Sequence, residues 1–577
     1  MTRNRSINRV VTCVAALSAM VVLVTVAVTT TASGAPTPTA RATARSGPVA
    51  RWANRAIEKR PVVHRAPAAT VSAPVRTMTR VRSNVAAASP TPTPAGPAPT
   101  VFEGISNNST VSPPDPTGDV SETQYVQAVN SLKGARIAVY DKTNGNLVAG
   151  PFLLDKLWRG GRCGNHGEGD PVVQFDPLAQ RWVLSQFAFK FDDFGNPVGP
   201  YSECIAVSTS SDAAGTYYPY GYLISNTAFP DFPKFGVWPD GYYMSIHLYG
   251  VSGSTKQGII AFDRESMLTG APARQLIFFV NSGLFGLLPS DLEGTTPPPA
   301  GAPNYLVVLR DNNVGAPADK IFLYAFFANW NRPKHSHIDG AAQFATQPFN
   351  SNLCHGGFFC LPQKGTGMKL DAIGGTPGVG SYLMYPLVYR NYGDHEALAF
   401  QHTVKVGTTR HAGINWFEVR DPSTTPTLFQ QGTYAPDSLD RWVGSIAMDG
   451  FGGIAMAFST TSADSYPSIA YTGRIQSDTI NQMPLGDQPI VAGGGSQTFS
   501  PRWGDYTALS VDPLDDCTFW YTDEFYPSSS HYGWHTAIAS FRLPTCSGAP
   551  GSPSPRPSAS PTPTPAQSPT PSPSATP

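Results

Sequence analysis

Between residues 101 and 546 the chain repeats one pattern of apolar and polar positions. An apolar run is followed by a turn of Asp or Gly residues and then by a second run rich in aromatic residues. Such strand–turn–strand units are typical of antiparallel β-hairpins. Only the segment FDRESMLTG, which begins at Phe262, has the pattern of a helical turn. The pattern therefore predicts an all-β domain over 101–546.

The spacing of these units matches four short strands with their loops. Successive units begin 46, 64, 70, 65, 73 and 63 residues apart, at Tyr125, Pro171, Phe235, Tyr305, Leu370, Val443 and Tyr506. Radial repetition of four-stranded sheets gives a β-propeller, which protects its sheet edges. We predict a β-propeller of seven blades. Six blades are the alternative if the Tyr125 unit completes the last blade, and a long two-domain sandwich is the other architecture.

Two later segments resemble the Asp-box turn of sialidase-like propellers, whose pattern is S-x-D-x-G-x-T-W. They are IAVSTSSDAAGTYYPY from Ile205 and IAMAFSTTSADSYPSIAY from Ile454. The matching positions are Ser210, Asp212, Gly215 and Tyr217, with one extra residue before the Gly and Tyr in place of Trp, and Ser462 and Asp464 without a Gly in the second copy. This resemblance implies a turn architecture and transfers no catalytic residue.

Three longer runs resemble secreted bacterial β-propeller proteins that have no assigned activity. They are PPDPTGDVSETQYVQAVN from Pro113, DFPKFGVWPDGYY from Asp231 and SPRWGDYTALSVDPLDDCTFWYTDEFY from Ser500. The resemblance covers nearly all of 101–546. It implies a propeller fold and an extracellular address, but no reaction.

The N-terminus has the three-part layout of a secretory signal peptide. Three arginines precede an apolar run over residues 10–28, and small residues precede Ala35. We therefore expect a signal peptide over 1–34. The apolar run is long for a cleaved signal, so an uncleaved membrane anchor is the alternative.

The segments that flank the body are too polar or too rich in Pro to form a core. Residues 35–100 carry ten Lys or Arg and one acidic residue, whereas 101–546 carry 39 acidic and 26 basic residues. We predict a disordered, basic linker over 35–100, either merely solvated or in contact with an anionic wall polymer or membrane surface. Residues 547–577 predict a disordered Pro/Ser/Thr-rich tail of extended polyproline type.

Composition excludes several classes of protein. Only 14% of the residues are charged, while Gly and Pro number 54 and 56. These values argue against coiled coils and nucleic-acid binding. No apolar span of 20 residues follows residue 30, so no membrane span is expected once the signal is removed. We expect a secreted or cell-surface monomer.

Six cysteines remain after removal of the signal segment, and an even number in an exported protein favours disulfides. Sequence order favours local pairs, namely Cys163 with Cys204, Cys354 with Cys360 and Cys517 with Cys546. Zinc is the rival interpretation, although no CxxC motif occurs.

Cationic residues recur just before the predicted innermost strands. They are Lys234 in PKFG, Arg441 in DRWVG and Arg502 in PRWGD, with Lys369 before Leu370 as a fourth and Asp170 in GDPVV at the equivalent place. If they ring the channel, they could bind a carboxylate, sulfate or phosphate. The alternative is that they pack with Trp238, Trp442 and Trp503 and pair with acids such as Asp440 and Asp505, and so join neighbouring blades.

Glycoside hydrolysis requires two facing carboxylates. The candidates near the predicted channel mouth are Glu168, Asp170, Asp231 and Asp505, with Tyr506 beside the last. The competing interpretation is that these acids cap turns.

Metal and nucleophile motifs are weak or missing. His335, His337 and Asp339 in KHSHID could form a metal site, and the DPLDD turn from Asp512 could hold a structural calcium ion. Exposed histidines and a plain hairpin turn are the simpler interpretations, so we predict no metal and no cofactor. The chain has no GxSxG, HExxH or GxxxxGK[ST] motif.

The sequence therefore leads to three functional hypotheses. The first is an exported propeller that binds a glycan or another anionic ligand at its central face. The second is a glycoside hydrolase or lyase of sialidase-like architecture that uses the same mouth. The third is a scaffold for extracellular proteins. A pair of channel carboxylates with a raised acid pKa would favour the second over the first.

Overall fold

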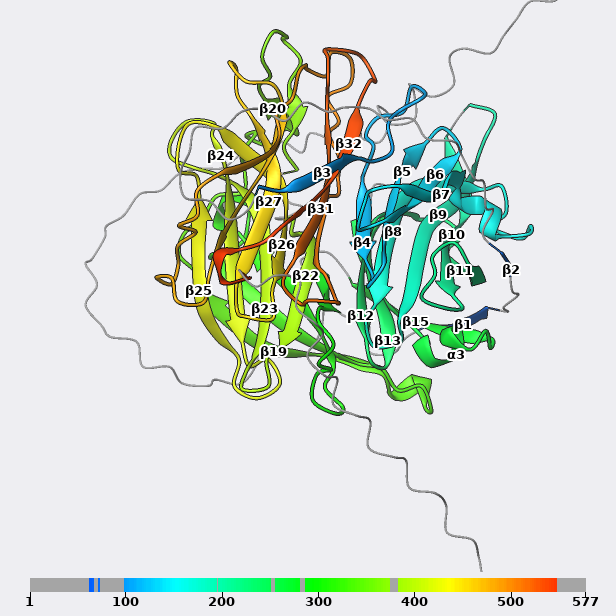
Figure 1. The fold of residues 1–577 in the computed structure, drawn as a ribbon. Helices are drawn as coiled ribbons and strands as arrows, with labels where there is room; N and C mark the ends of the chain where they lie inside the picture. The colour runs from blue at the N-terminus through cyan, green and yellow to red at the C-terminus, as the bar shows by residue number, and fades with distance from the viewer. Residues whose placement is uncertain are drawn as a thin grey trace, which may run out of the picture. The chain divides into compact units, whose positions relative to one another are not determined.

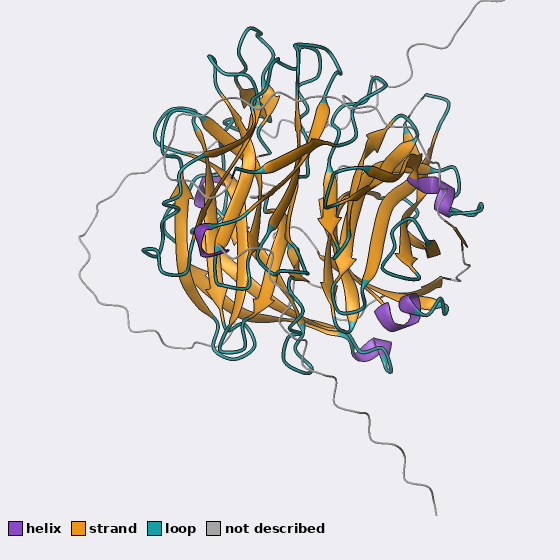
Figure 2. Ribbon diagram, viewed as in Figure 1, coloured by secondary structure: helices purple, strands orange, loops and turns teal. Residues whose placement is uncertain are grey.

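The computed structural model describes residues 62–66, 71–72, 98–194, 196–250, 255–280, 286–373 and 382–546. Strands make up most of this part of the chain, and the helices are short (Figure 2). They are α3 (Arg264–Leu268), η1 (Leu154–Leu157), η2 (Asn312–Val314), η3 (Pro333–His335) and η4 (Pro544–Cys546). The all-β prediction is confirmed, and α3 lies in the segment whose sequence predicts a helical turn.

Most of the strands fall into seven antiparallel groups of four (Figure 1). Each group is named here by its first strand in sheet order. The first four groups are β4 (Thr117–Val120), β5 (Gln124–Ser131), β6 (Gly134–Asp141) and β7 (Leu147–Leu153); β8 (Gly167–Asp176), β9 (Arg181–Phe191), β10 (Pro197–Ser208) and β11 (Thr216–Ser225); β12 (Phe229–Trp238), β13 (Gly241–Tyr249), β14 (Thr255–Phe262) and β15 (Ala273–Val280); and β16 (Leu288–Leu292), β17 (Asn304–Arg310), β18 (Lys320–Phe327) and β19 (His337–Ala345).

The remaining groups follow the same plan. They are β22 (Met384–Asn391), β23 (Glu396–Lys405), β24 (Ala412–Arg420) and β25 (Thr427–Tyr434); β26 (Asp440–Met448), β27 (Ile454–Thr461), β28 (Ser468–Arg474) and β29 (Gln488–Val491); and β30 (Ala508–Val511), β31 (Phe519–Phe525), β32 (His535–Phe541) and β3 (Thr100–Glu103). The unit from Leu370 does not form the predicted hairpin, because β21 (Leu370–Asp371) pairs with β20 (Phe359–Leu361) and β22 pairs with β23.

The first strands of the groups lie side by side in a closed series. β4 neighbours β8, and the series continues through β12, β16, β22, β26 and β30 back to β4. β16 and β22 even share a parallel ladder, which joins their two groups into one sheet of eight strands. Gly236 of β12 permits the close approach of β16, because a Cβ there would overlap the carbonyl oxygen of Ser290. This cyclic arrangement of antiparallel sheets is that of a β-propeller.

The β30 group combines both ends of the body. β3 pairs with β32 over four residues, so a strand from the start of the body completes the sheet formed by its last three strands. The ring of Phe102 on β3 also lies 5.7 Å from Tyr140 and 6.2 Å from Trp520, measured between ring centroids. The N-terminal strand thereby covers an edge that would otherwise be open.

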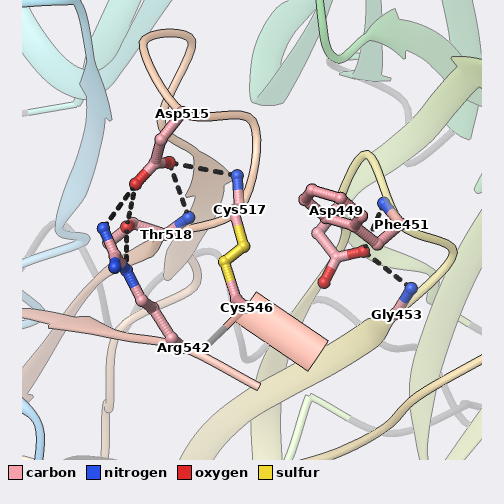
Figure 3. The surroundings of a disulfide bond; sticks show 8 residues. All are labelled: Asp449, Phe451, Gly453, Asp515, Cys517, Thr518, Arg542 and Cys546. Atoms are coloured by element: carbon pink, nitrogen blue, oxygen red, sulfur yellow. Dashed lines mark hydrogen bonds and ion pairs between the residues drawn. A yellow bond between two sulfur atoms is a disulfide. The ribbon is translucent and has the colours of Figure 1, made fainter. Parts of the chain in front are cut away.

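Three disulfides join the six cysteines in the pairs that sequence order favours: Cys163–Cys204, Cys354–Cys360 and Cys517–Cys546. The third ties η4, which follows β32, to the loop between β30 and β31 (Figure 3). Beside it, Asp515 accepts the N–H of Cys517 (3.1 Å) and pairs with Arg542, the residue after β32 (2.6 Å). A covalent link and an ion pair therefore hold the end of the last strand.

Tryptophans fill the space between groups, as the structural interpretation of the sequence predicted. Trp238, Trp442 and Trp503 are fully buried. The rings of Trp442 and Trp503 lie 5.7 Å apart, and Trp238 lies edge-on to Tyr389 of β22 at 4.7 Å. Large aromatic side chains bury much apolar area at such contacts. These tryptophans therefore pack between strand groups and do not form a surface for a ligand.

Two short strands fall within the segment predicted as a linker. β1 (Val62–Ala66) pairs with β15, and β2 (Val71–Ser72) pairs with β11. The predicted signal peptide, the rest of the linker up to residue 97 and the C-terminal tail lie outside the described residues. In the described part of the chain, no helix has the length and apolar character needed to cross a membrane.

We expect removal of β3 to destabilise the body. A chain without residues 1–104 should lose at least about 3 kcal/mol of unfolding free energy relative to one without residues 1–97, because a net hydrogen bond contributes about 1 kcal/mol and the contacts of Phe102 are lost as well. Urea unfolding followed by tryptophan fluorescence measures the difference. Equal stability of the two truncated chains would show that β3 does not close the sheet.

Candidate functional site

The innermost strands begin with irregular backbone. β8, β12 and β26 each pair with the next strand of their group, and near the start of each strand this pairing is interrupted. Asp170, Phe232 and Val443 at these breaks have φ of 46°, 59° and 48°. Bulky residues rarely adopt a left-handed conformation, and such bulges redirect side chains. The strand starts are therefore shaped to aim side chains inward, at some cost in backbone strain.

One cluster of ionisable side chains gathers at these strand starts. Its members come from β21 and from the segments that begin the β4, β8, β12 and β30 groups. They are Asp115, Asp170, Asp231, Lys234, Asp371, Arg502, Asp505 and Tyr506. Five carboxyl groups thus surround two cations, and we refer to these eight residues as the mouth cluster.

The carboxyl groups of Asp115 and Asp170 accept hydrogen bonds from the backbone near the other acids of the cluster. Asn130 connects Asp115 and Asp170, because its Nδ2 donates to Asp115 (2.6 Å) and its Oδ1 accepts the N–H of Asp170 (2.9 Å). Asp115 in turn accepts the backbone N–H of Asp505 (2.6 Å). Asp170 accepts the N–H of Phe232, the residue after Asp231, at 3.3 Å. The buried acids therefore fix the backbone that carries Asp231 and Asp505.

The two cations of the cluster have different surroundings. Arg502 pairs with Asp505 and, through Nε, with Asp371 (3.0 Å). Lys234 is 4% exposed, and its Nζ lies 2.8 Å from the ring centroid of Phe232 and 4.6 Å from that of Tyr506. None of the described residues accepts a hydrogen bond from Lys234 Nζ. Burial lowers the pKa of Lys234 to about 7, although nearby carboxylates oppose that shift.

Burial raises the pKa of four of the carboxyl groups. The pKa of Asp231 rises to about 6, through burial and then the charge of Asp505, and the pKa of Asp371 also rises to about 6 through burial. The pKa values of Asp115 and Asp170 lie well above the usual range, again because of burial and neighbouring carboxylates. The cluster can therefore hold protons at mildly acid pH.

Solvent reaches only part of the cluster. Asp115, Asp170, Asp371 and Tyr506 are buried, whereas Asp231 is partly exposed and the side chain of Asp505 is 20% exposed. Tyr249 and Tyr382 are also partly exposed, and the Asp231 charge raises the pKa of both, after burial. Asp231 and Asp505, which come from different groups, are therefore the carboxylates that a ligand could contact.

The structure brings together six of the residues singled out in the sequence. They are Asp170, Asp231, Lys234, Arg502, Asp505 and Tyr506. Arg441 is not among them: it has no exposed surface and pairs with Asp437 (2.9 Å) and Asp487 (2.6 Å). Lys369 is exposed. The predicted ring of four cations is therefore reduced to two at the mouth.

The other predicted sites have ordinary structural partners. Glu168 has a pKa raised to about 7 by burial and by Asp155, not by the mouth cluster. In the DPLDD turn, Asp512 pairs with Lys142 (2.7 Å). His337 and Asp339 lie 3.5 Å apart on the surface. Over the described ranges, no group of three or more His, Cys, Asp or Glu side chains could hold a metal ion.

Sequence reasoning missed several members of the site. Asp115 and Asn130 lie in runs quoted for their resemblance, and Asp371 directly follows the aligned position Leu370. His247 is opposite Asp231 in the β12–β13 register, and burial and then the Lys234 charge lower its pKa well below the usual value. The signal that could have found Asp371 is its place one residue after an aligned strand start.

No protein-family model matches the chain, and no curated protein matches it. Among solved structures, it is similar to polysaccharide lyase PL25, an ulvan lyase, with 11% identity and a TM-score of 0.32, over 78% of this chain and 95% of that chain. A Hadza microbial sialidase has 13% identity and a TM-score of 0.35, over 63% and 65%. An α-L-arabinanase from Penicillium chrysogenum has 8% identity and a TM-score of 0.35, over 77% and 99%. At this level of similarity none of them lends a residue role to this chain.

The raised pKa of Asp231 predicts a pH-dependent gain in stability for Asp231→Asn. The folded state binds this proton more tightly than the unfolded chain, so ionisation destabilises the fold as the pH rises through about 6. The difference in unfolding free energy between the variant and the unmodified protein should be about 1–3 kcal/mol more favourable to the variant at pH 8 than at pH 4. Urea unfolding at both pH values measures this. Asp464→Asn, at an exposed turn, is the control, and an equal effect of Asp231→Asn at both pH values would contradict the prediction.

Proposed function

We propose that this protein is an exported, glycan-cleaving hydrolase built on a seven-bladed β-propeller, with its active site at the mouth cluster. One observation carries the proposal. Asp231 and Asp505 come from different strand groups, are both accessible, and differ in environment: one has a raised pKa, and the other is paired with Arg502. Pairs of carboxyl groups whose surroundings separate their protonation are the pattern of acid–base catalysis.

The chemistry of the site suits a glycosidic bond. Hydrolysis of such a bond requires one protonated and one ionised carboxyl group. We assign the general acid to Asp231, which would donate its proton to the leaving glycosidic oxygen as the bond from that oxygen to the anomeric carbon breaks. Asp505 would act on the opposite side, as base for the attacking water or as nucleophile. If Asp505 is the base, it takes a proton from the attacking water, whose hydroxyl bonds to the anomeric carbon, and exchange with solvent then returns a proton to Asp231. If Asp505 is the nucleophile, its bond to the anomeric carbon is broken by a second water, which gives its hydroxyl to that carbon and its proton to Asp231.

The charges of the mouth favour an uncharged substrate. Arg502 is neutralised by Asp371 and Asp505, and Lys234 has a lowered pKa. A carboxylated or sulfated glycan would therefore meet more carboxylates than free cations.

The architecture and location are part of the proposal. The closed series of seven strand groups supports seven blades, with β3 as the outer strand of the last blade. Three disulfides support export to an oxidising compartment.

Hydrolysis should require both accessible carboxylates. On a panel of neutral oligosaccharides and polysaccharides, assayed by release of reducing ends, Asp231→Asn and Asp505→Asn should each lower kcat by a factor of about 10²–10⁴, because each removes one half of the acid–base pair. Activity should also fall as the pH rises through about 6, when Asp231 loses its proton. Asp464→Asn serves as the matched control.

Two outcomes would overturn this assignment. One is full activity in either carboxylate variant whose fold is confirmed by circular dichroism. The other is retention of neutral glycans without release of reducing ends from any of them, which would identify a binding protein.

A further inference from the structure

A compact group of aromatic rings stands apart from the main core. Phe187, Phe189, Tyr201 and Phe229 form their own cluster, which joins the β8 and β12 groups. The ring centroids of Phe189 and Phe229 lie 5.2 Å apart, and those of Tyr201 and Phe229 lie 5.6 Å apart. Edge-on packing of this kind holds the rings in fixed orientations.

The cluster continues onto the surface. Phe191 packs edge-on against Phe189 at 5.2 Å and is 46% exposed. Phe194, at the turn after β9, is 87% exposed, and Val198 on β10 is 36% exposed. A buried aromatic base therefore supports exposed apolar side chains on the β9–β10 hairpin, which is an arrangement expected of an interaction surface.

This surface borders the mouth cluster. Phe229 and Asp231 are two residues apart on β12, before the break in register that follows Asp231, so both side chains lie on one face of the strand. Tyr249, opposite Phe229 in the β12–β13 register, is partly exposed, and Asp231 contributes to the shift of its pKa. The aromatic cluster thus reaches β12 at Phe229, two residues before the accessible carboxylate.

We infer that the exposed rings of Phe191 and Phe194 form a platform for sugar units beyond the two that are joined by the bond to be cleaved, so that the substrate is a neutral polysaccharide and not a single terminal sugar. This inference rests on the proposed function, because the platform is defined by its position beside Asp231. Sugar rings present C–H faces that pack on flat aromatic side chains, and their hydroxyls remain in water at an exposed surface. A chain that lies across the β9–β10 hairpin would enter the mouth at Phe229.

Affinity electrophoresis of the full chain can test the platform apart from catalysis. The gels contain laminarin, xylan, mannan, arabinan or hydroxyethyl cellulose, with polygalacturonate as the charged comparison. The proteins are Asp231→Asn, the same chain with Phe191→Ala and Phe194→Ala, and the same chain with Phe451→Ala. Phe451 is 54% exposed at the turn between β26 and β27 and is the matched control.

At least one neutral polysaccharide should retard Asp231→Asn and the Phe451→Ala control equally. The double Phe→Ala variant should bind it at least about tenfold more weakly, since each ring contributes a contact of its own. With the catalytically intact chain, the same double substitution should raise KM for that polymer and leave kcat/KM for its disaccharide unchanged.

The results separate the two proposals. Equal retention of the double variant and the control overturns the platform, whatever the activity. Loss of retention in the double variant, together with absence of cleavage by the intact chain, supports the platform and overturns hydrolysis. Absence of retention by every polysaccharide overturns the platform and leaves hydrolysis to be judged by the oligosaccharide assay.

Discussion

The innermost strands require hydrogen-bond acceptors where their edges face the centre of the ring, and partly buried carboxyl groups supply them. Glu293, which follows β16, accepts the N–H of Val511 on β30 (2.8 Å) and of Met448 on β26 (3.0 Å). Asp119 of β4 accepts the N–H of Phe175 on β8 (2.6 Å). A buried N–H without a partner is costly, so these carboxyl groups hold neighbouring groups together.

Burial changes the protonation of these acids. The pKa of Asp119 rises to about 6 and that of Glu293 to about 8, chiefly through burial. Both residues line a cavity of about 40 Å³ at the ends of the inner strands. At the strand starts, Asp115 and Asp170 serve the same bracing role toward the backbone of Asp505 and Phe232. The carboxyl groups that can exchange protons at the mouth thus include those that join the strands by accepting backbone hydrogen bonds.

Much of the fold could be predicted from the sequence, because alternating apolar strands and Asp or Gly turns are local signals. The units from Phe235 and Val443 became the hairpins β12–β13 and β26–β27. The short innermost strands β4 and β16 escaped detection. They carry Asp119 and Asp291, whose carboxyl groups take hydrogen bonds from other groups, so their sequences lack an apolar run. The strand β3 was missed for a different reason: its partner strand β32 lies more than 400 residues away in the sequence.

The residues of the site could be predicted only where the position of a residue within its repeat determines the surroundings of its side chain. Alignment of strand starts selected Lys234 and Arg502, which lie in the mouth cluster, and also Arg441, which does not. The acids that pair with Arg441 are Asp437 and Asp487, which lie just before β26 and β29 of its own group, and they enclose its guanidinium in ion pairs. For Arg502, one partner is Asp371, brought from another group by closure of the ring. The position of a residue within a repeat thus specifies its place on the strand. Contacts between repeats decide whether its side chain is enclosed in structural ion pairs or lies at an accessible site.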